Sequence, residues 1–309
     1  MPPDISQLHT RFFTVLTELF PGVQHLHYGV SDEPRAGLLT MPFALREGPW
    51  RTLAYLVEAG ELDLLDAPHT LDVGCGVGGT ALFLAEHLGH QVTGLNITQV
   101  QVDRARENVA AAGLEGRVEV VCGDACAMPF PDASFDAVTL IECAFHVADK
   151  PALFGEIARV LKPGGRLVMA DQIRADAPLE VMGLFFFVAE GDYEALAADA
   201  GLNLGGMWDL SHEIATWMTH YARLAATPVH GLVAAWALLR LRPALAWRYL
   251  SGVAWFNALL REDFEGRGIR TRPWSNALRA LREHTRDELD DGRSSYRIWR
   301  FDKPPHGTG

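Results

Sequence analysis

Between about residues 66 and 170, short apolar runs alternate with longer amphipathic segments, and this pattern predicts strands and helices in turn. Gly89 and Gly113 are well placed to end two of the helices, and Pro151 suits the first turn of a third. Thr98 and Gln101 have the spacing of a capping box. The predicted strands are 70–73, 91–95, 118–121, 137–141 and 167–170, and the predicted helices are 80–88, 98–112 and 152–161.

The flanking sequence has a different pattern. Apolar residues at helical spacing, without strand runs, fill 1–65 and most of 211–293, whereas 193–200 indicates one more helix and 206–210 and 294–301 two more strands. We therefore expect an α/β, Rossmann-like fold, with a seven-stranded, mainly parallel sheet, helices on both faces and helical additions that form a cap. The expected parts are an N-terminal helical lid (1–65), the core (66–210), a helical cap insertion (211–293) and a last strand with a tail (294–309).

Composition narrows the classes of function. The chain has 309 residues, of which 49% are hydrophobic and 21% charged, so it can form a globular core. Lys and Arg number 27 against 39 Asp and Glu, and the formal charge of −12 disfavours nucleic acid and anionic membranes as partners. The N-terminal residues lack the pattern of a signal peptide, and the longest apolar run, 225–239, is shorter than the roughly 20 residues of a membrane span.

The four cysteines are Cys75, Cys122, Cys126 and Cys143. None forms a C-x-x-C pair, which indicates reduced thiols and a cytoplasmic location. Cys122 and Cys126 lack a third metal ligand nearby in the sequence, so we interpret them as buried apolar thiols and expect no metal site.

A glycine-rich segment follows the first predicted strand. Gly74, Gly76 and Gly79 fit G-x-G-x-x-G, a turn that lets a ligand approach bare backbone at the positive end of a helix. Dinucleotides and S-adenosylmethionine both use such a turn. Asp72 discriminates between them, because its carboxylate at the end of the strand would repel a pyrophosphate but could pair with the ammonium group of S-adenosylmethionine.

Three motifs in order, LDVGCGVGG, GDACAMPFPDASFDAV and ARVLKPGGRLVMAD, resemble those of class I S-adenosylmethionine-dependent methyltransferases over about residues 68–210. The segment HQVTGLNITQVQVDRARENV is similar to the subgroup that methylates small molecules, which includes natural-product sugar O-methyltransferases and tocopherol-type and prenyl-diphosphate C-methyltransferases. The resemblance implies a Rossmann-like core that binds S-adenosylmethionine. The cofactor contacts that it implies are Asp72, Gly74, Gly76 and Gly78, with Asp124 and Ala125 beside the adenine and Tyr28, in LHYGV, folded over the site.

Asn96 departs from the pattern of the superfamily. Most members end the second strand with Asp or Glu, which holds the ribose hydroxyls, but an amide can also hydrogen-bond a ribose. The subgroup tolerates this change and often adds a glutamine at the position of Gln101. The alternatives are that Gln101 only caps a helix and that Asn96 is an ordinary loop residue.

His146 and Asp171 are the candidate catalytic pair. His146 follows the fourth strand and Asp171 ends the fifth, at the edge where ligands bind in open α/β sheets. Methyl transfer depends mainly on holding the nucleophile in line, yet a hydroxyl acceptor benefits from a base. In the sugar O-methyltransferases that this segment resembles, a histidine acts near the acceptor hydroxyl with an aspartate alongside. Phe145 replaces the first of the two histidines that some members carry, and a structural His146 is the alternative.

Glu142 supports a second chemistry. In the prenyl-diphosphate C-methyltransferases that the segment also resembles, a glutamate at this position faces the carbocation formed when an alkene is methylated. The alternative is a structural or cofactor-side carboxylate. A diphosphate acceptor would need basic groups, and Arg240 and Arg242 are the nearest approach to such a cluster.

Aromatic residues in the flanking segments suit a largely apolar acceptor pocket. We expect most of them to be core, with Phe185–Phe187 as the exception. Three consecutive aromatic residues cannot all face one core from a helix, so at least one should meet the pocket, a lid or a second subunit, as in a homodimer.

We therefore expect a cytoplasmic S-adenosylmethionine-dependent methyltransferase that acts on a small, largely apolar acceptor, at a hydroxyl with His146 as base. The alternatives are C-methylation with Glu142 facing the cation, a nicotinamide-dependent oxidoreductase, and a non-catalytic binding protein.

Overall fold

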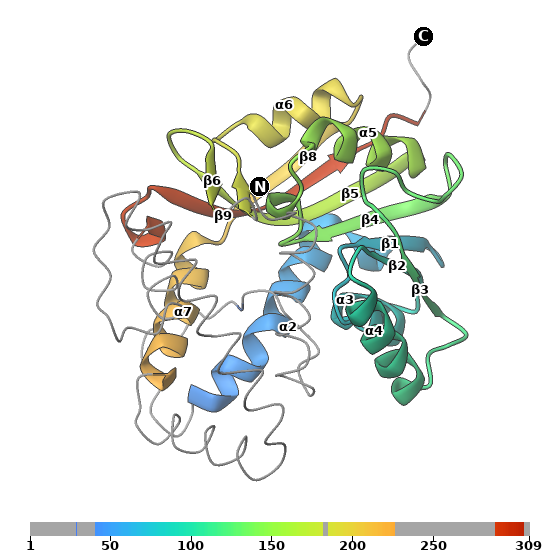
Figure 1. The fold of residues 1–309 in the computed structure, drawn as a ribbon, viewed down its shortest axis with the longest axis horizontal. Coiled ribbons are helices and arrows are strands. Elements are labelled where there is room, and N and C mark those ends of the chain that lie inside the picture. Colours follow the sequence, from blue (N-terminus) through green and yellow to red (C-terminus); the bar gives the residue numbers. More distant parts are fainter. Residues whose placement is uncertain (1–28, 30–40, 182–184, 226–287, 306–309) are drawn as a thin grey trace, which may run out of the picture.

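The structure is a computed structural model, which describes residues 29, 41–181, 185–225 and 288–305 (Figure 1). Its main sheet has seven strands in the order β3-β2-β1-β4-β5-β9-β8. The predicted mainly parallel sheet is confirmed, because β1 to β5 are parallel and only β9 runs against its neighbours. The strands are β1 (His69–Val73), β2 (Gln91–Asn96), β3 (Val118–Cys122), β4 (Phe135–Ile141), β5 (Leu161–Arg174), β8 (Asn203–Asp209) and β9 (Ser294–Asp302).

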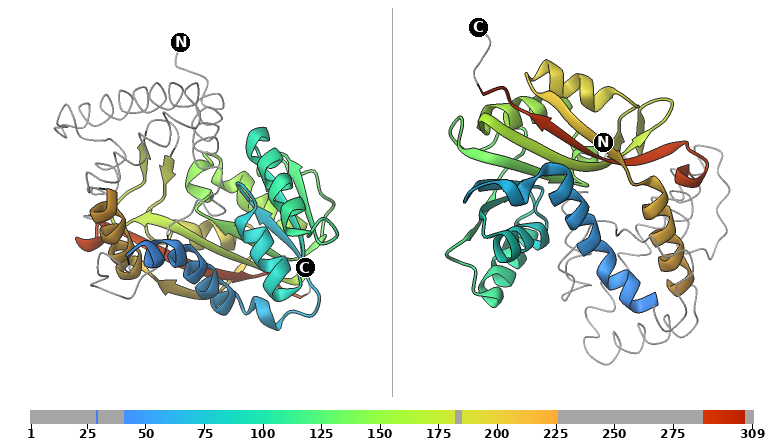
Figure 2. Two further views of the ribbon diagram at one scale, coloured as in Figure 1. Left: turned by 90° about the horizontal axis from the view of Figure 1, so that it is seen from below. Right: turned by 180° about the vertical axis from the view of Figure 1, so that it is seen from behind.

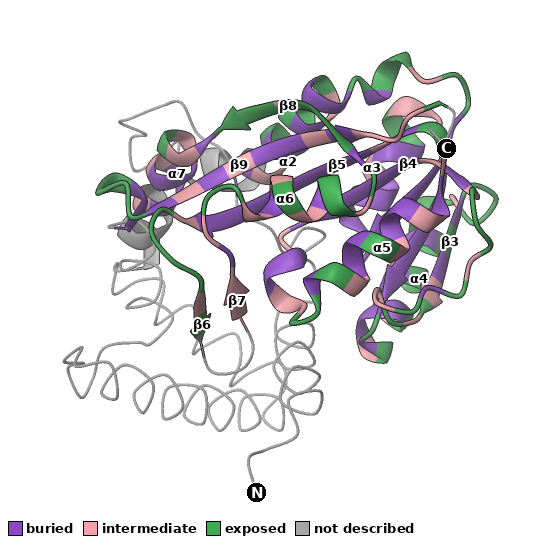
Figure 3. Ribbon diagram, turned by 90° about the horizontal axis from the view of Figure 1, so that it is seen from above, coloured by how far each residue is buried: buried purple, intermediate pink, exposed green. Residues whose placement is uncertain are grey.

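Helices cover both faces of this sheet (Figures 1 and 2). Residues of α2, α3, α4 and α7 pack into one apolar core, and residues of α5 and α6 pack into a second core on the opposite face. Figure 3 shows the buried strands between these layers and the exposed edge strand β8. The helices are α2 (Met41–Gly60), α3 (Gly79–Leu88), α4 (Gln99–Ala112), α5 (Lys150–Val160), α6 (Asp192–Asp199) and α7 (Ser211–Ala225), with short 3₁₀ turns η1 (Leu62–Leu64) and η2 (Ala144–His146).

The helix ends follow the sequence signals closely, with one exception. Gly89 and Gly113 end α3 and α4 in the left-handed conformation, at φ 73° and 67°. Asp149 caps α5 by accepting a hydrogen bond from the Ala152 amide at 3.0 Å. The predicted capping box is wrong, because Thr98 precedes α4 but its side chain makes no capping hydrogen bond.

A small two-stranded sheet, β6 (Leu179–Val181) and β7 (Phe185–Phe187), was not predicted. It places the phenylalanine triplet in a strand rather than a helix, with all three residues half-buried. β5 is also longer than expected. Leu161 at its start pairs with Phe135 of β4, and β9 pairs with it from Arg166 to Arg174.

The interpretation of Cys122 and Cys126 as buried thiols is wrong. Cys122 is exposed and Cys126 is half-buried. Cys122 is exposed at the end of β3, the edge strand of the sheet, although it lies on the same side of the strand as the buried Val118 and Val120. The described residues contain no cluster of three metal-ligating side chains.

Other predictions lie wholly or partly outside the described residues. Tyr28, Arg240, Arg242 and most of the lid and cap belong to this group, so the division into four parts stays a prediction. No helix within the described ranges is long and apolar enough to cross a bilayer.

Candidate active site

The glycine-rich loop joins β1 to α3 at the centre of the sheet, beside the point where the strand order reverses between β1 and β4. Gly74, Gly76 and Gly78 all have positive φ angles, of 73°, 54° and 90°. A Cβ atom on Gly74 would lie only 2.3 Å from Sγ of Cys143, so this position excludes any side chain. The three predicted glycines therefore present bare backbone at the edge of the sheet, as a cofactor cradle requires.

Asp72 lies immediately below this loop and is 2% exposed. Thr139 Oγ1 donates a hydrogen bond to its Oδ1 at 3.0 Å. Within the described residues Oδ2 has no hydrogen-bond partner. Burial raises the pKa of this carboxyl to about 7. The Ala81 amide acts to lower the pKa of this carboxyl, but no described side chain donates to Oδ2, so this oxygen fits the ammonium group of S-adenosylmethionine.

Asn96 ends β2 and contacts Gln101 in the first turns of α4. Asn96 Nδ2 donates to Gln101 Oε1 at 2.7 Å, and both side chains are buried. The alternative in which Gln101 only caps the helix is therefore not supported. Gln101 Nε2 and Thr98 Oγ1 are buried without a hydrogen-bond partner in the described residues, so this corner retains polar groups that suit ribose hydroxyls.

Asp124 and Ala125 lie in the loop after β3. Asp124 is exposed, and its Oδ1 accepts a hydrogen bond from the Cys126 amide at 2.8 Å. Ala125 is half-buried against the core. The loop keeps the side chain of Asp124 at its surface, where the adenine is expected.

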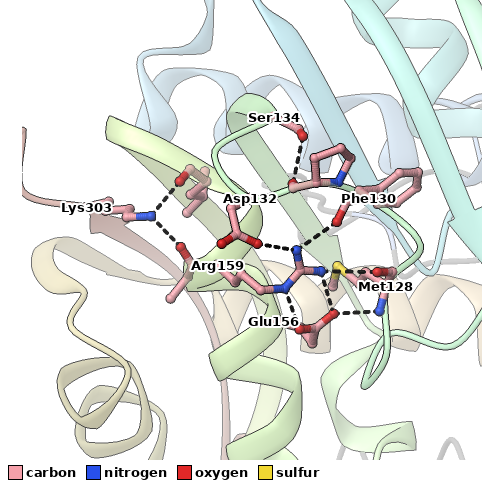
Figure 4. Close-up of polar contacts among 10 residues, drawn as sticks. Met128, Phe130, Asp132, Ser134, Glu156, Arg159 and Lys303 are labelled. Atoms are coloured by element: carbon pink, nitrogen blue, oxygen red, sulfur yellow. Dashed lines mark hydrogen bonds and ion pairs between the residues drawn. The ribbon is translucent and has the colours of Figure 1, made fainter.

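Arg159, on α5, binds residues 128–132 in the second half of the same loop (Figure 4). Its guanidinium donates to the carbonyls of Met128 at 3.1 Å and Phe130 at 2.7 Å. It also pairs with Asp132 and with Glu156, whose Oε2 accepts from the Met128 amide at 2.6 Å. The sequence motif contains Arg159, but nothing local to it indicated that it clamps this loop.

His146 ends the turn η2, which directly follows β4. Its ring is half-buried, 4.3 Å from the ring centre of Phe145 and 5.0 Å from that of Phe185 on β7. Phe145 also stacks on Phe187 at 5.4 Å. Phe145 and two residues of the triplet, Phe185 and Phe187, thus form a group of aromatic rings beside the predicted base, called the aromatic wall below.

Asp171 lies beneath this turn and is fully buried. Its Oδ2 accepts from the Phe145 amide at 3.0 Å and from the Tyr193 hydroxyl at 2.9 Å, and its Oδ1 accepts from the Gln172 amide at 2.8 Å. Burial raises the pKa of Asp171 to about 7. These contacts make Asp171 an anchor for the turn that carries His146. Tyr193 was not identified from the sequence.

Lys150 joins the same turn to β7. It is 6% exposed, and its Nζ donates to the carbonyl of Val147 and, at 2.9 Å, to that of Phe186. Burial lowers the pKa of Lys150 to about 8, against the attraction of Asp171. Sequence reasoning missed this residue, although a cation at the start of a helix opposes the helix dipole and was a usable signal.

Glu142 is the first residue after β4 and has a φ of 48°, which is unusual for a residue other than glycine. Its amide donates to the Ala170 carbonyl at 2.8 Å, and its Oε1 accepts from the Tyr296 hydroxyl at 2.9 Å. Glu142 and His146 therefore follow the carboxyl end of β4, as predicted. Asp171 lies within β5, three residues before the strand ends at Arg174, so the prediction that it ends the fifth strand is wrong.

Several known proteins with similar sequences are methyltransferases. A family model described as "Methyltransferase domain" matches residues 71–169. The 24-methylenesterol C-methyltransferase 2 of Oryza sativa subsp. japonica is 46% identical over 127 residues, 38% of this chain and 35% of that protein. The 27-O-demethylrifamycin SV methyltransferase of Amycolatopsis mediterranei is 33% identical over 221 residues, 68% of this chain and 77% of that protein. The chain thus spans about a third of the sterol enzyme and about three quarters of the rifamycin enzyme.

The fold is also shared with solved structures. The geranyl diphosphate C-methyltransferase of Streptomyces coelicolor A3(2), in complex with Mg²⁺, geranyl diphosphate and S-adenosyl-L-homocysteine, superposes with a TM-score of 0.67. It is 15% identical, over 98% of this chain and 100% of that one, so the likeness shows the fold alone. The motifs, the cradle beside Asp72 and the rifamycin relative agree: the chain belongs to the S-adenosylmethionine-dependent methyltransferases, and S-adenosylmethionine is its cofactor.

Proposed function

We propose that this methyltransferase acts on a hydroxyl of a small, largely apolar, natural-product-type acceptor, with His146 as the base. The observation that carries the proposal is the position of His146, which lies against an aromatic wall at the carboxyl end of β4. The turn that holds it is fixed from below by Asp171.

The described residues include candidate ligands for three parts of the cofactor. Asp72 would take the ammonium group, the backbone of Gly74 the methionine moiety, and Asn96 with Gln101 the ribose. When bound, S-adenosylmethionine supplies an electrophilic methyl group on a cationic sulfur. Asp124 and Ala125 are proposed to lie beside the adenine, as the family resemblance implies.

His146 would take the proton that the acceptor hydroxyl releases as its oxygen forms the bond to carbon. A neutral imidazole can accept this proton near neutral pH. Asp171 contributes through the backbone, because its carboxylate holds the amide of Phe145, the residue before His146. Together, Lys150 and Asp171 would hold the imidazole of His146 in place beside the rings of the aromatic wall.

The surroundings favour an uncharged acceptor. Phe145, Phe185 and Phe187 offer apolar ring surface. Two cations near this edge are already engaged: Lys150 with main-chain carbonyls, and Arg174 with Glu288. Carbon methylation remains the second candidate, because Glu142 presents a carboxylate at the same edge.

The test begins with isothermal titration of the full chain with S-adenosylhomocysteine and, in parallel, with NAD. We expect binding of the first and not of the second. Transfer of a tritiated methyl group is then measured with 27-O-demethylrifamycin SV and with geraniol as probe acceptors, and the methylated atom is located by NMR. A methyl group on oxygen supports the proposal, whereas a methyl group on carbon favours the second candidate. Failure to bind S-adenosylhomocysteine at millimolar concentration contradicts both.

Three further expectations accompany this proposal. A cytoplasmic location, the formation of a homodimer and the lack of a nucleic-acid partner are proposed on the grounds given by the sequence. Light scattering and fluorescence polarisation with a labelled duplex would test the last two.

A further inference from the structure

Tyr296 reaches Glu142 across the sheet. Tyr296 lies on β9, where it pairs with Gln172 of β5, and is 1% exposed. Its hydroxyl donates to Oε1 of Glu142 at 2.9 Å, although 154 residues separate the two in the sequence. The contact therefore joins the last strand of the sheet to the residue that immediately follows β4.

The backbone of Glu142 is held in a costly conformation. Its φ of 48° lies in the left-handed region, which disfavours residues with a Cβ atom. Such a conformation persists only where the surroundings impose it, and these outliers gather at functional sites. Here the Glu142 amide bonds to Ala170 on β5 and the carboxylate bonds to Tyr296 on β9. The chain thus keeps a glutamate at a position that glycine would fill without strain.

The location of Glu142 connects it with the proposed site. The next residue, Cys143, lies against Gly74 of the cofactor loop, and His146 follows three residues later. Glu142 therefore lies between the strand that ends beside the cofactor loop and the turn that carries the proposed base.

We propose that Tyr296 is a positioning residue that fixes the Glu142 carboxylate on the acceptor side of the site. A phenol that donates to a carboxylate favours the charged form. In this position the carboxylate would accept a hydrogen bond from the hydroxyl of a neutral acceptor. In carbon methylation it would instead stabilise the positive charge that develops on the acceptor. This proposal rests on the proposed function. The hydrogen bond from Tyr296 to Glu142, and its effect on the titration of Glu142, can nevertheless be measured without an acceptor.

A second phenol–carboxylate pair supplies the matched control. The Tyr193 hydroxyl donates to Asp171 at the same distance, 2.9 Å, and Tyr193 is also fully buried. Tyr193→Phe and Tyr296→Phe therefore remove the same kind of bond from two neighbouring places. Only the second change is expected to act on Glu142.

The experiment follows the carboxylate of Glu142 by ¹³C NMR in the full chain labelled at the glutamate side-chain carboxyl carbons, with Glu142→Gln to assign its signal. Tyr296→Phe is expected to raise the titration midpoint of Glu142 by about half a pH unit or more, since one hydrogen bond to the charged form is lost. Tyr193→Phe should leave the midpoint unchanged. An equal midpoint in the wild type and in Tyr296→Phe overturns the proposal. If Tyr296→Phe does not fold, 3-fluorotyrosine at position 296 keeps the ring and strengthens the donor; the midpoint should then fall, and an unchanged value contradicts the proposal.

A second measurement compares kcat of the variants and the wild type, with whichever probe acceptor the enzyme methylates. Tyr296→Phe is expected to lower kcat about tenfold, with affinity for S-adenosylhomocysteine unchanged. In a Glu142→Gln background the same change should have no further effect, because Tyr296 acts through Glu142. Additive losses overturn the proposal. If neither probe acceptor is methylated, the proposed function is in question, while the NMR arm still decides the role of Tyr296.

Discussion

Asn96 donates a hydrogen bond from its side-chain amide to that of Gln101 at 2.7 Å, in a buried corner between β2 and α4. By the family resemblance, Asn96 stands where most of the superfamily has an acidic residue. Because Gln101 accepts with Oε1, its Nε2 remains without a partner among the described residues. An amide pair can thus offer a donor where a carboxylate could only accept.

Gln101→Leu is expected to weaken binding of S-adenosylhomocysteine about fivefold, because a neutral hydrogen bond contributes about 1 kcal/mol. Isothermal titration measures the change. Gln99→Leu is the control, since Gln99 makes an exposed bond to Asp103 at 2.7 Å on the same helix. Equal effects of the two changes would remove the case for Gln101 as a cofactor ligand.

Asp72 should make stability depend on pH in a defined direction. Its pKa is raised from 3.8 to about 7 by burial, so between these values the folded chain holds a proton that the unfolded chain releases. The resulting stabilisation is fully present below pH 3.8 and is lost as the pH rises through 7.

Asp72→Asn should therefore melt at an increasingly higher temperature than the wild type as the pH rises from about 5 to about 8, without cofactor. Its affinity for S-adenosylmethionine should fall between about tenfold and a hundredfold, since a hydrogen bond to a charged group is lost. Scanning calorimetry and titration measure the two effects. A difference in Tm that is constant with pH would show that Asp72 is ionised throughout.

His146→Ala tests the proposed base. We expect kcat with a methylated acceptor to fall by about a hundredfold or more, at unchanged affinity for S-adenosylhomocysteine. The exposed His212, on α7, provides the control substitution. A loss of less than about threefold would assign His146 to packing against Phe145 and Phe185 rather than to proton transfer.

Lys150→Met should loosen β7 selectively. Amides of Phe185–Phe187 are expected to exchange with deuterium about tenfold faster, because the Phe186 carbonyl loses a charged donor. Lys303→Met is a close control, since Lys303 also donates to two main-chain carbonyls, those of Ala158 and Leu161. Peptide-level mass spectrometry measures the exchange. Equal protection of β7 in both variants would mean that Lys150 does not hold it.

The sequence predicts those features that depend on neighbouring residues. Gly89 and Gly113 end their helices as expected, and Asp72 and Asn96 lie at strand ends because the apolar runs mark the strands. In the predicted capping box, the Thr98 side chain makes no capping bond and the Gln101 side chain accepts a hydrogen bond from Asn96.

Contacts between distant segments account for what the sequence did not predict. Tyr296 and Glu142 are joined only once β9 lies beside β5, and Tyr193 meets Asp171 only once α6 packs on the sheet. No local spacing encodes such pairs. The same holds for the last part of β5, residues 171–174, which pairs with β9.

The insertion of β9 between β5 and β8 bears on how the protein is made. During synthesis on the ribosome, every other strand of the sheet emerges before Ser294–Asp302, so a nascent chain must keep the edges of β5 and β8 unpaired until this segment arrives. Pairing across so long a separation is slow to form and leaves such edges open to association with other chains. Helper proteins that shield the growing chain are expected to increase its yield.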